Sequence, residues 1–442
     1  MTQEGKTHHF VGIKGSGMSS LARIVQGVGY KVQGSDVETY FFTEEGLKED
    51  NIPYMVFDAD NIQEDQTVIV GNAFGEDHPE VARARELGLD VYYYHEFLGQ
   101  VIQKYLSVGV TGSHGKTSTT GLLAHTLDGL ANISYLIGDG SGQGKLNSTH
   151  FVVEACEYRR HFLAYHPDYV IITNIDFDHP DYFKSLEDVI DAFQSFANQA
   201  SKAVIAWGED PNISAITNQQ PIYYYGLKDT NDVYAANINR NPEGSEFNVI
   251  FQGKDIGRFQ VPAYGEHNIL NALSVIALLH LEGFASEDIA RELATFQGVQ
   301  RRFSVTELKG LTIIDDYAHH PSEITATIDA IKQRFPGKKV VAIFQPHTFS
   351  RTRALLNEFG QALALADDVY LVDIFHSARE ASGTVTIEDL AAATPGHFVN
   401  YVSNDTLDPL MDYQEAVLVF MGAGNIDQIA RQFEKEYLAS NH

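Results

Sequence analysis

The fold of this chain is decided by residues 106–127, which read LSVGVTGSHGKTSTTGLLAHTL. The apolar run Leu106–Val110 predicts a buried strand, and Thr117–Leu127 predicts a helix. The segment between them carries Gly112 and Gly115, so its backbone N–H groups are accessible to phosphate oxygens. A strand, a glycine-bearing loop and a helix in this order predict a site for the phosphates of a nucleotide.

Two side chains of this phosphate loop have predicted roles. Lys116 is placed to reach the β- and γ-phosphates, and the Thr117 hydroxyl is placed to bind Mg²⁺. The usual loop has a glycine five residues before Gly115, where this chain has Val110, so Gly112 supplies the flexibility of a variant loop. The residues predicted to surround the phosphates are Gly112, Ser113, His114, Gly115, Lys116, Thr117 and Ser118.

A second glycine turn lies near the N-terminus, between a predicted strand at His9–Ile13 and a predicted helix at Met18–Gly29. Such a turn lets a diphosphate approach a helix N-terminus, and Asp36 follows the next predicted strand at a distance suited to a ribose hydroxyl. The candidate residues are Gly12, Lys14, Gly15, Ser16, Gly17 and Asp36. Lys14 stands where the dinucleotide fingerprint has glycine, so a tight turn without a ligand stays open as an alternative.

Composition limits the classes of function. The chain has 442 residues, a formal net charge of −28 and 44% hydrophobic residues, which excludes a disordered chain and argues against general binding to nucleic acid or anionic membranes. Cys156 is the only cysteine, which excludes an intrachain disulfide and fits a reducing compartment. No apolar run approaches the roughly 20 residues of a membrane span, and the N-terminus lacks an apolar signal core. We expect a soluble, cytoplasmic protein that acts on small molecules.

Apolar runs alternate with amphipathic stretches along the whole chain, which is typical of a parallel α/β architecture. Residues 231–262 differ, because their short alternating runs predict an antiparallel ribbon. A further α/β unit begins near residue 304. We expect three α/β domains, at residues 1–104, 105–303 and 304–442.

Acidic and histidine side chains follow the strands of the middle unit. Glu154 ends a predicted strand, where a carboxylate suits Mg²⁺, and Glu157 is near enough to be confused with it. His179 lies in the polar segment Asn174–Asp181 after the next strand and is a candidate ligand of a second cation. An ordinary helix-entry carboxylate and a capped turn are the alternatives for these two positions.

Two asparagines and two arginines later in the chain are further candidate ligand-binding residues. Asn268 and Asn271 are three residues apart in a predicted helix, so they share a face that suits an adenine edge, although helix capping by Asn268 is an alternative. Arg301 and Arg302 suit a clamp for a phosphate or carboxylate.

In the last unit, polar clusters follow three strands at residues 315–321 (DDYAHHP), 345–353 (QPHTFSRTR) and 422–426 (GAGNI), which predicts one binding face.

Taken together, these motifs resemble those of the Mur ligase family over essentially the whole chain, and the DDYAHHP run with the first glycine turn resembles its L-alanine-adding branch. The resemblance implies a Rossmann-like N-terminal domain for the UDP-sugar, a central P-loop α/β domain for ATP and Mg²⁺, and a Rossmann-like C-terminal domain for the amino acid. The implied reaction joins L-alanine to the lactyl carboxylate of UDP-N-acetylmuramate through an acyl phosphate, in peptidoglycan synthesis. A monomer or a weak homodimer is expected.

The resemblance also implies roles for single residues. The turn at residues 12–17 would hold the UDP pyrophosphate, and Lys116 would hold the ATP phosphates. Thr117 and Glu154 would bind one Mg²⁺, and His179 a second. The remaining implied residues are His267, Asn268 and Asn271 around adenosine, Arg302 near the phosphates, and Tyr317, His319 and Arg351 near alanine. The base that deprotonates the amine would be His319 or an acid such as Asp178.

Three departures from the family pattern matter. Lys14 breaks the first glycine turn, and the run from Glu154 to Glu157 differs from the acid-rich run of many members. Thr348 stands where many relatives have arginine, which leaves Arg351 as the carboxylate anchor. Phe193 and Gln194 lie where sister ligases carry a carbamylated lysine, so that modification is not expected. The alternatives are a sister ligase that attaches whole peptides, a folate polyglutamate ligase, an NAD-dependent oxidoreductase that leaves Lys116 unexplained, and a nucleotide-binding regulator without chemistry.

Overall fold

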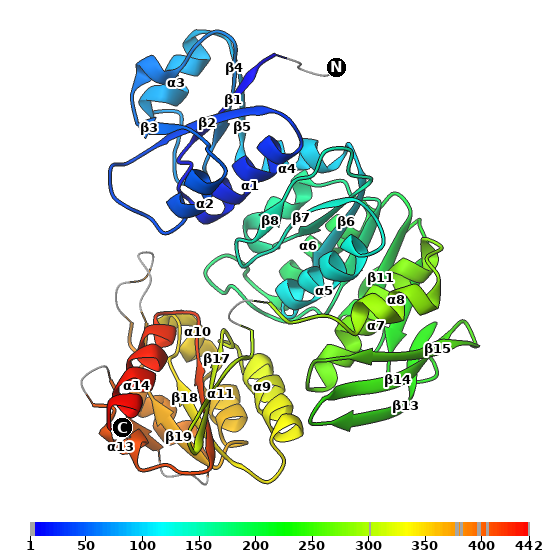
Figure 1. Cartoon of the computed structure of the whole chain (residues 1–442), viewed down its shortest axis with the longest axis vertical. Helices are drawn as coiled ribbons and strands as arrows, with labels where there is room; N and C mark the ends of the chain where they lie inside the picture. Colours follow the sequence, from blue (N-terminus) through cyan, green and yellow to red (C-terminus); the bar gives the residue numbers. More distant parts are fainter. Residues whose placement is uncertain are drawn as a thin grey trace. The chain divides into compact units, whose positions relative to one another are not determined.

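The computed structural model describes residues 5–299, 302–375, 380, 383–395, 399–403 and 406–440. The chain forms two compact units. The first comprises Met1–Ile175, Ile190–Tyr225 and Ser274–Glu292, and the second comprises Asp176–Val189, Gly226–Leu273 and Leu293–His442. Within them lie parallel sheets with helices on their faces, so the predicted α/β class is confirmed (Figure 1).

The first unit begins with a five-stranded parallel sheet in the order β3-β2-β1-β4-β5. Its strands are β1 (Thr7–Val11), β2 (Lys31–Asp36), β3 (Tyr54–Val56), β4 (Gln66–Val70) and β5 (Asp90–Tyr93). Its helices are α1 (Ser16–Gly27), α2 (Glu44–Glu49), α3 (Pro79–Glu86) and α4 (Tyr94–Ile102), with a 3₁₀ turn η1 at Ala59–Asn61. Side chains alternate along β1: Val11 packs with α3, whereas the Phe10 ring lies 6.3 Å from that of Phe97 on α4.

The first unit also holds seven strands of the central sheet, in the order β12-β11-β10-β6-β9-β7-β8. They are β6 (Leu106–Thr111), β7 (Ile133–Leu136), β8 (Gly142–Gln143), β9 (His150–Glu154), β10 (Tyr169–Ile172), β11 (Ala203–Trp207) and β12 (Ile222–Gly226). The helical segments of this part of the chain are α5 (Lys116–Asp128), η2 (Tyr158–Ala164), α6 (Leu186–Ala197), η3 (Ile213–Ala215) and α8 (Ser286–Leu293). Because β6 pairs in parallel with both β9 and β10, the residues that follow these three strands meet at one edge of the sheet.

The second unit contains the predicted antiparallel ribbon, which is confirmed as β13 (Val233–Asn241), β14 (Gly244–Phe251) and β15 (Lys254–Val261). Helix α7 (Glu266–Leu281) follows it. The third sheet has the order β16-β17-β21-β18-β19-β20. Its strands are β16 (Ser304–Leu308), β17 (Leu311–Asp316), β18 (Lys339–Phe344), β19 (Asp368–Leu371), β20 (Val399–Tyr401) and β21 (Ala416–Met421). The helices around it are α9 (Pro321–Arg334), α10 (Phe349–Ala354), α11 (Leu356–Leu363), α12 (Ile387–Ala393), α13 (Asp408–Met411) and α14 (Ile426–Ser440).

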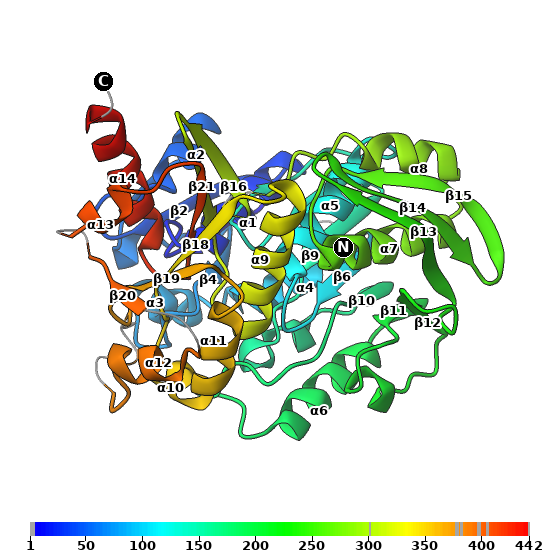
Figure 2. The same cartoon turned by 90° about the horizontal axis from the view of Figure 1, so that it is seen from below.

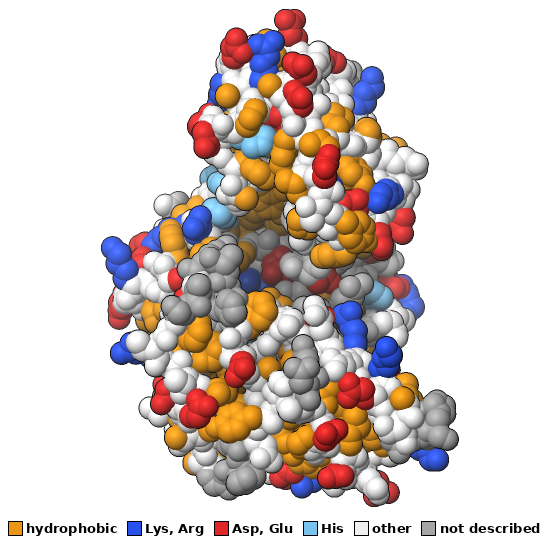
Figure 3. All heavy atoms as spheres, turned by 90° about the vertical axis from the view of Figure 1, so that its left-hand side faces the viewer, with side chains coloured by type: hydrophobic (Ala, Val, Ile, Leu, Met, Phe, Trp, Pro, Cys, Tyr) orange, Lys and Arg blue, Asp and Glu red, His pale blue; other side chains and the backbone are white. Residues whose placement is uncertain are grey.

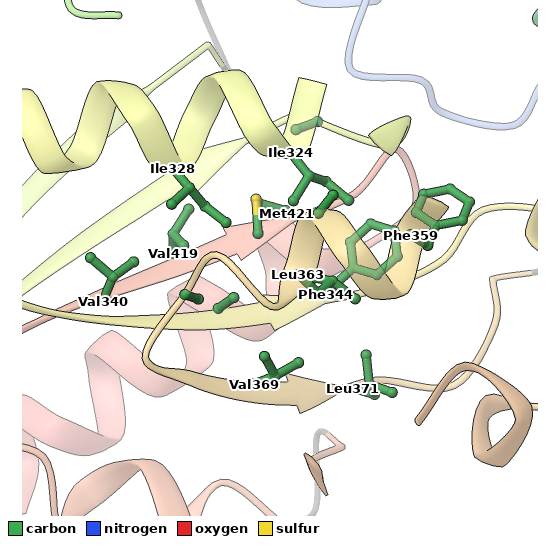
Figure 4. Close-up of a cluster of buried hydrophobic side chains, with 14 of the residues drawn as sticks. Ile324, Ile328, Val340, Phe344, Phe359, Leu363, Val369, Leu371, Val419 and Met421 are labelled. Atoms are coloured by element: carbon green, nitrogen blue, oxygen red, sulfur yellow. The ribbon is translucent and has the colours of Figure 1, made fainter. Parts of the chain in front are cut away.

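Helices cover both faces of the third sheet (Figures 1 and 2). Figure 4 shows Val340, Phe344 and Met421 of the strands facing Ile324 of α9 and Phe359 of α11. The intervening residues of the same strands, such as Ile343 and Phe420, pack instead with α14. A strand buried on both faces explains the continuous apolar runs that the sequence shows here.

Three differences from the sequence prediction have local causes. The apolar run Tyr169–Ile175 predicts one strand, but β10 ends at Ile172, because Thr173 and Asn174 turn to bond the phosphate loop. β1 ends at Val11 instead of Ile13, because the N–H groups of Gly12 and Ile13 both donate to the Ser35 carbonyl oxygen. β16, which no periodicity signalled, pairs antiparallel with β17 at the sheet edge.

Among the described residues, no helix combines the length and the apolar character needed to cross a membrane. Figure 3 shows acidic side chains scattered over the visible face, in keeping with the formal net charge of −28.

Candidate functional site

The phosphate loop connects β6 to α5, as predicted. Gly115 stands at the N-cap of α5 with φ of 80°, and Gly112 has φ of 142°. A Cβ atom on Gly112 would lie 1.9 Å from Oγ1 of Thr173, so backbone conformation and space both require glycine there. Gly112 is therefore a fixed part of the loop, set against the residue that follows β10.

Asn174 holds the loop in place. Its Oδ1 accepts the His114 N–H at 2.9 Å, and its Nδ2 donates to the His114 carbonyl oxygen at 3.0 Å. The Ser113 N–H donates to the backbone oxygen of Asn174 at 3.0 Å. The sequence indicated Asn174 only as part of a polar segment. Its hydrogen bonds to a loop 60 residues earlier in the chain form because β6 and β10 are adjacent strands.

Lys116 is held by a carboxylate and by the loop itself. Its Nζ lies 3.0 Å from Oε2 of Glu157 and donates to the carbonyl oxygens of Ser113, at 3.1 Å, and Gly112. Burial acts to lower the pKa of Lys116, but the charge of Glu157, helped by Glu154, holds this pKa well above its usual range. The ammonium is therefore charged at any physiological pH, ready for an anionic ligand.

Glu154 has different partners. The Thr117 hydroxyl donates to its Oε1 at 3.2 Å, and the Gly138 N–H donates to its Oε2 at 2.7 Å. A hydroxyl and a carboxylate this close are hard oxygen ligands of the kind that Mg²⁺ prefers. The residues present thus fit the predicted cation, with Glu154 beside Thr117 and Glu157 beside Lys116.

The first glycine turn precedes α1 and is bound by Asp36. Oδ2 of Asp36 accepts the Lys14 N–H at 2.7 Å, and its Oδ1 accepts the Val37 N–H at 2.8 Å. The Lys14 ammonium is buried, 2.8 Å from Oε1 of Glu44, and lowers the pKa of that carboxyl to about 2. These contacts order the turn Gly12–Gly17, and its predicted binding of a UDP-sugar stays a prediction.

The polar start of α7 belongs to the second unit. Nδ2 of Asn271 donates to Oδ1 of Asn268 at 3.3 Å, so the two amides share a face as predicted. Nδ2 of Asn268 donates to the Tyr264 carbonyl oxygen at 2.7 Å and lies 3.0 Å from Nε2 of His267. Burial lowers the pKa of His267 to about 4, so its ring is neutral at physiological pH. Contact of these residues with adenosine stays a prediction.

The carboxyl edge of the third sheet gathers the polar clusters predicted for it, because β17, β21 and β18 are neighbours. The Arg302 guanidinium lies over the Tyr317 ring, 5.0 Å from its centroid. The His319 ring lies 5.2 Å from that of Tyr317, and its Nδ1 is 3.1 Å from Oε2 of Glu323. The structure thus brings Arg302, Tyr317 and His319 together, whereas Arg301 lies outside the described residues.

Arg351, also in the second unit, is buried against Asp178. Its Nη2 and Nε donate to Oδ1 of that carboxylate at 2.8 and 3.1 Å. His179 has a left-handed backbone with φ of 56°, and its N–H donates to the same oxygen at 2.7 Å. Because His179 is in the second unit and the phosphate loop in the first, its role as a second cation ligand stays a prediction.

Three family models match the chain in succession. They are described as "Mur ligase family, catalytic domain" over residues 7–106, "Mur ligase middle domain" over 110–279 and "Mur ligase, glutamate ligase domain" over 301–424. A UDP-N-acetylmuramate–L-alanine ligase of Levilactobacillus brevis is 54% identical over 429 residues, covering 97% of this chain and 96% of the relative. The chain belongs to the Mur ligase family.

The similarity extends to a second relative and to a solved structure. The chain is 53% identical over 428 residues to a UDP-N-acetylmuramate–L-alanine ligase of Lacticaseibacillus paracasei, covering 97% of this chain and 98% of the relative. The crystal structure of a UDP-N-acetylmuramate-alanine ligase from Thermotoga maritima is 29% identical, with a TM-score of 0.79, and covers 98% of this chain and 99% of that chain. The resemblance stated from the motifs is confirmed.

Proposed function

We propose that this Mur ligase joins L-alanine to the lactyl carboxylate of UDP-N-acetylmuramate and converts ATP to ADP and phosphate, in peptidoglycan precursor synthesis. The names of relatives that are 53–54% identical over nearly the whole chain support this reaction. The observation that carries the proposal is the phosphate loop, in which Lys116 pairs with Glu157 while Thr117 pairs with Glu154. We assign the activity to the cytoplasm, a reducing compartment that suits a sequence with one cysteine.

The chemistry follows from the weakness of a carboxylate as an acyl donor. Transfer of the γ-phosphoryl group to the lactyl carboxylate forms an acyl phosphate, which the neutral amine of alanine attacks with loss of phosphate. The first step brings two anions together, and the permanent charge of Lys116 offsets their repulsion. A base, His319 or Asp178, takes the proton that the amine loses.

Thr117 and Glu154 would hold Mg²⁺, with His179 proposed for a second ion. When bound, the metal neutralises phosphate charge and polarises the transferred group. Glu154 is prepared for this role by the Gly138 N–H and the Thr117 hydroxyl, which fix both of its oxygens. The remaining ATP contacts are assigned to the loop residues Gly112–Ser118 and to His267, Asn268, Asn271 and Arg302.

The other two substrates are assigned to separate sites. The turn Gly12–Gly17, with Asp36, would bind the UDP diphosphate and ribose. Tyr317, His319 and Arg351 would bind alanine, and the guanidinium of Arg351 would recognise its carboxylate.

The test is a phosphate-release assay with purified protein, ATP, Mg²⁺ and a panel of alanine, glycine, serine and an alanine-containing peptide. We expect release only when both UDP-N-acetylmuramate and an amino acid are present, with alanine preferred. Lys116→Ala should lower kcat at least 100-fold, since it removes a charge that stabilises the transferred phosphoryl group. Lys435→Ala, at an exposed lysine on α14, is the control. Release with the peptide but not with free alanine would instead identify a peptide-attaching sister ligase.

A further inference from the structure

The loop after β11, residues 208–212, carries a buried carboxylate that none of the three proposed substrate sites uses. Asp210 is 5% exposed. Its Oδ2 accepts the Ile175 N–H at 2.7 Å, and its Oδ1 accepts the Asn212 N–H at 2.8 Å. A buried carboxylate is unfavourable unless hydrogen bonds compensate for the lost water, so the position of this side chain is tied to these two backbone donors.

Strand order brings this loop to the residues that follow β10. β10 pairs in parallel with β11 on one side and with β6 on the other. The chain segments after these three strands therefore leave the sheet at the same edge. Asp210 binds the segment Asn174–Ile175 from one side, and the phosphate loop binds it from the other.

A single peptide group, the one that joins Asn174 to Ile175, connects Asp210 to the phosphate loop. Its N–H donates to Asp210, and its carbonyl oxygen accepts the Ser113 N–H at 3.0 Å. Hydrogen bonds in such a chain polarise one another, so a carboxylate at the N–H makes the carbonyl oxygen a stronger acceptor. The charge of Asp210 therefore strengthens the hydrogen bond that Ser113 donates.

Two further contacts depend on the orientation of this peptide group. The Asn174 side chain, on the same segment, binds both backbone polar groups of His114. The Ser113 carbonyl oxygen accepts a hydrogen bond from the Lys116 ammonium at 3.1 Å. A rotation of the Asn174–Ile175 peptide would thus shift the loop at Ser113 and His114, and it would disturb the lysine proposed to hold the ATP phosphates.

A neighbouring side chain binds Ile175 in a different way. Nδ2 of Asn212 donates to the Ile175 carbonyl oxygen at 2.7 Å. That oxygen belongs to the next peptide group, between Ile175 and Asp176, and not to the one that bonds Ser113. Asp210 and Asn212 therefore bind the same residue equally closely, but of the two only Asp210 binds the peptide that reaches the phosphate loop.

We infer that Asp210 is a positioning residue of the nucleotide site. It orients the Asn174–Ile175 peptide and thereby holds the phosphate loop in the conformation that binds nucleotide phosphates. Asp210 acts through this peptide group and is assigned no contact with a substrate. This inference rests on the proposed binding of ATP at the phosphate loop.

The test is a calorimetric titration of the full-length protein with ADP in the presence of Mg²⁺, which needs no turnover. Wild type should bind one ADP. Asp210→Asn has a single acceptor oxygen for two N–H donors and no charge. It should weaken ADP binding about tenfold, at the lower end of the roughly ten- to hundredfold effect of a hydrogen bond to a charged group. Asn212→Ala, the matched control, should leave ADP affinity near the wild-type value.

A second ligand separates positioning of the loop from a general loss of structure. UDP-N-acetylmuramate is assigned to the first glycine turn, so Asp210→Asn should bind it as tightly as wild type. A variant that was merely destabilised would lose affinity for both ligands.

Hydrogen exchange of the wild-type protein keeps the test valid if Asp210→Asn does not fold. ADP should slow exchange at residues 173–176 and 208–212, to which no nucleotide contact is assigned, and leave the segment that joins β14 to β15 unchanged. Absence of ADP binding to wild type would overturn the proposed ATP site together with this inference. Wild-type ADP affinity in Asp210→Asn, equal weakening of both ligands, or unchanged exchange at residues 208–212 would overturn the inference alone.

Discussion

The ammonium of Lys116 lies 3.0 Å from the carboxylate of Glu157, whose side chain is 2% exposed. Glu154, three residues earlier, is bound instead by Thr117 and Gly138. Two nearby carboxylates of the same segment thus have separate partners, one a cation of the protein and the other a hydroxyl suited to a metal site. The first two predictions distinguish these roles.

Glu157→Gln should destabilise the protein and make activity sensitive to alkaline pH. It leaves a buried ammonium without its counter-charge, which costs about 3 kcal/mol of unfolding free energy. In wild type the raised pKa of Lys116 contributes stability that is fully present below the usual value of 10.5 and is lost only as pH rises through the higher folded value. In the variant, burial acts unopposed by Glu157 and lowers this pKa, so phosphate release should decline at a lower alkaline pH than in wild type.

Denaturant unfolding and a pH–rate profile measure these two effects. Glu64→Gln, at an exposed carboxylate, is the control. If Glu157→Gln had the same free energy of unfolding as wild type and the same rate of phosphate release at alkaline pH, the charge-pairing role would be contradicted.

Glu154→Gln should raise the Mg²⁺ concentration that gives half-maximal activity about tenfold, equivalent to roughly 1.4 kcal/mol. The amide keeps an oxygen near Thr117 but removes the negative charge that a hard divalent cation prefers. Mg²⁺ titrations of phosphate release measure this shift, and Glu157→Gln serves as the matched carboxylate control. The same Mg²⁺ dependence in Glu154→Gln and wild type would argue against Glu154 as a ligand.

Arg351→Ala should raise the KM for L-alanine between about tenfold and a hundredfold, because a charge-assisted contact to a carboxylate contributes roughly 1.5–3 kcal/mol. The KM for ATP should stay near the wild-type value. Arg353→Ala is the matched control, since Arg353 is two residues away, exposed, and bonds Thr384 at 3.0 Å. Equal effects of the two substitutions on the KM for alanine would remove Arg351 from the amino-acid site.

The free energy of unfolding should fall as pH decreases from 6.5 to about 4, in part through His8. Burial holds this histidine neutral in the folded state, whereas the unfolded chain takes up a proton near pH 6.5, so the stability is present above that pH and lost below it. The shift corresponds to about 3 kcal/mol. His8→Phe should remove this part of the pH dependence in urea unfolding at pH 7 and 4.5, while His267 and His347 still contribute in both proteins. Parallel pH dependences in the two proteins would show that His8 is protonated equally in both states.

Much of the fold follows from short-range patterns in the sequence. The strand, loop and helix around Lys116 are encoded within 22 consecutive residues, and the ribbon at residues 231–262 is encoded by local alternation. The edge strand β16 had no comparable signal, because a half-exposed strand of five residues needs few apolar side chains.

The sequence by itself determined which chemical groups are present, namely a phosphate loop, strand-end carboxylates and a polar edge on the last sheet, because glycine turns and buried strands are local properties of the chain. Only the tertiary structure decided their partners. Asn174 meets His114 because β10 lies beside β6. Glu154, at the end of β9, lies beside Thr117, and the segment that follows β9 brings Glu157 to Lys116. Such choices depend on contacts between residues dozens of positions apart, which strand order and packing set and local periodicity does not encode.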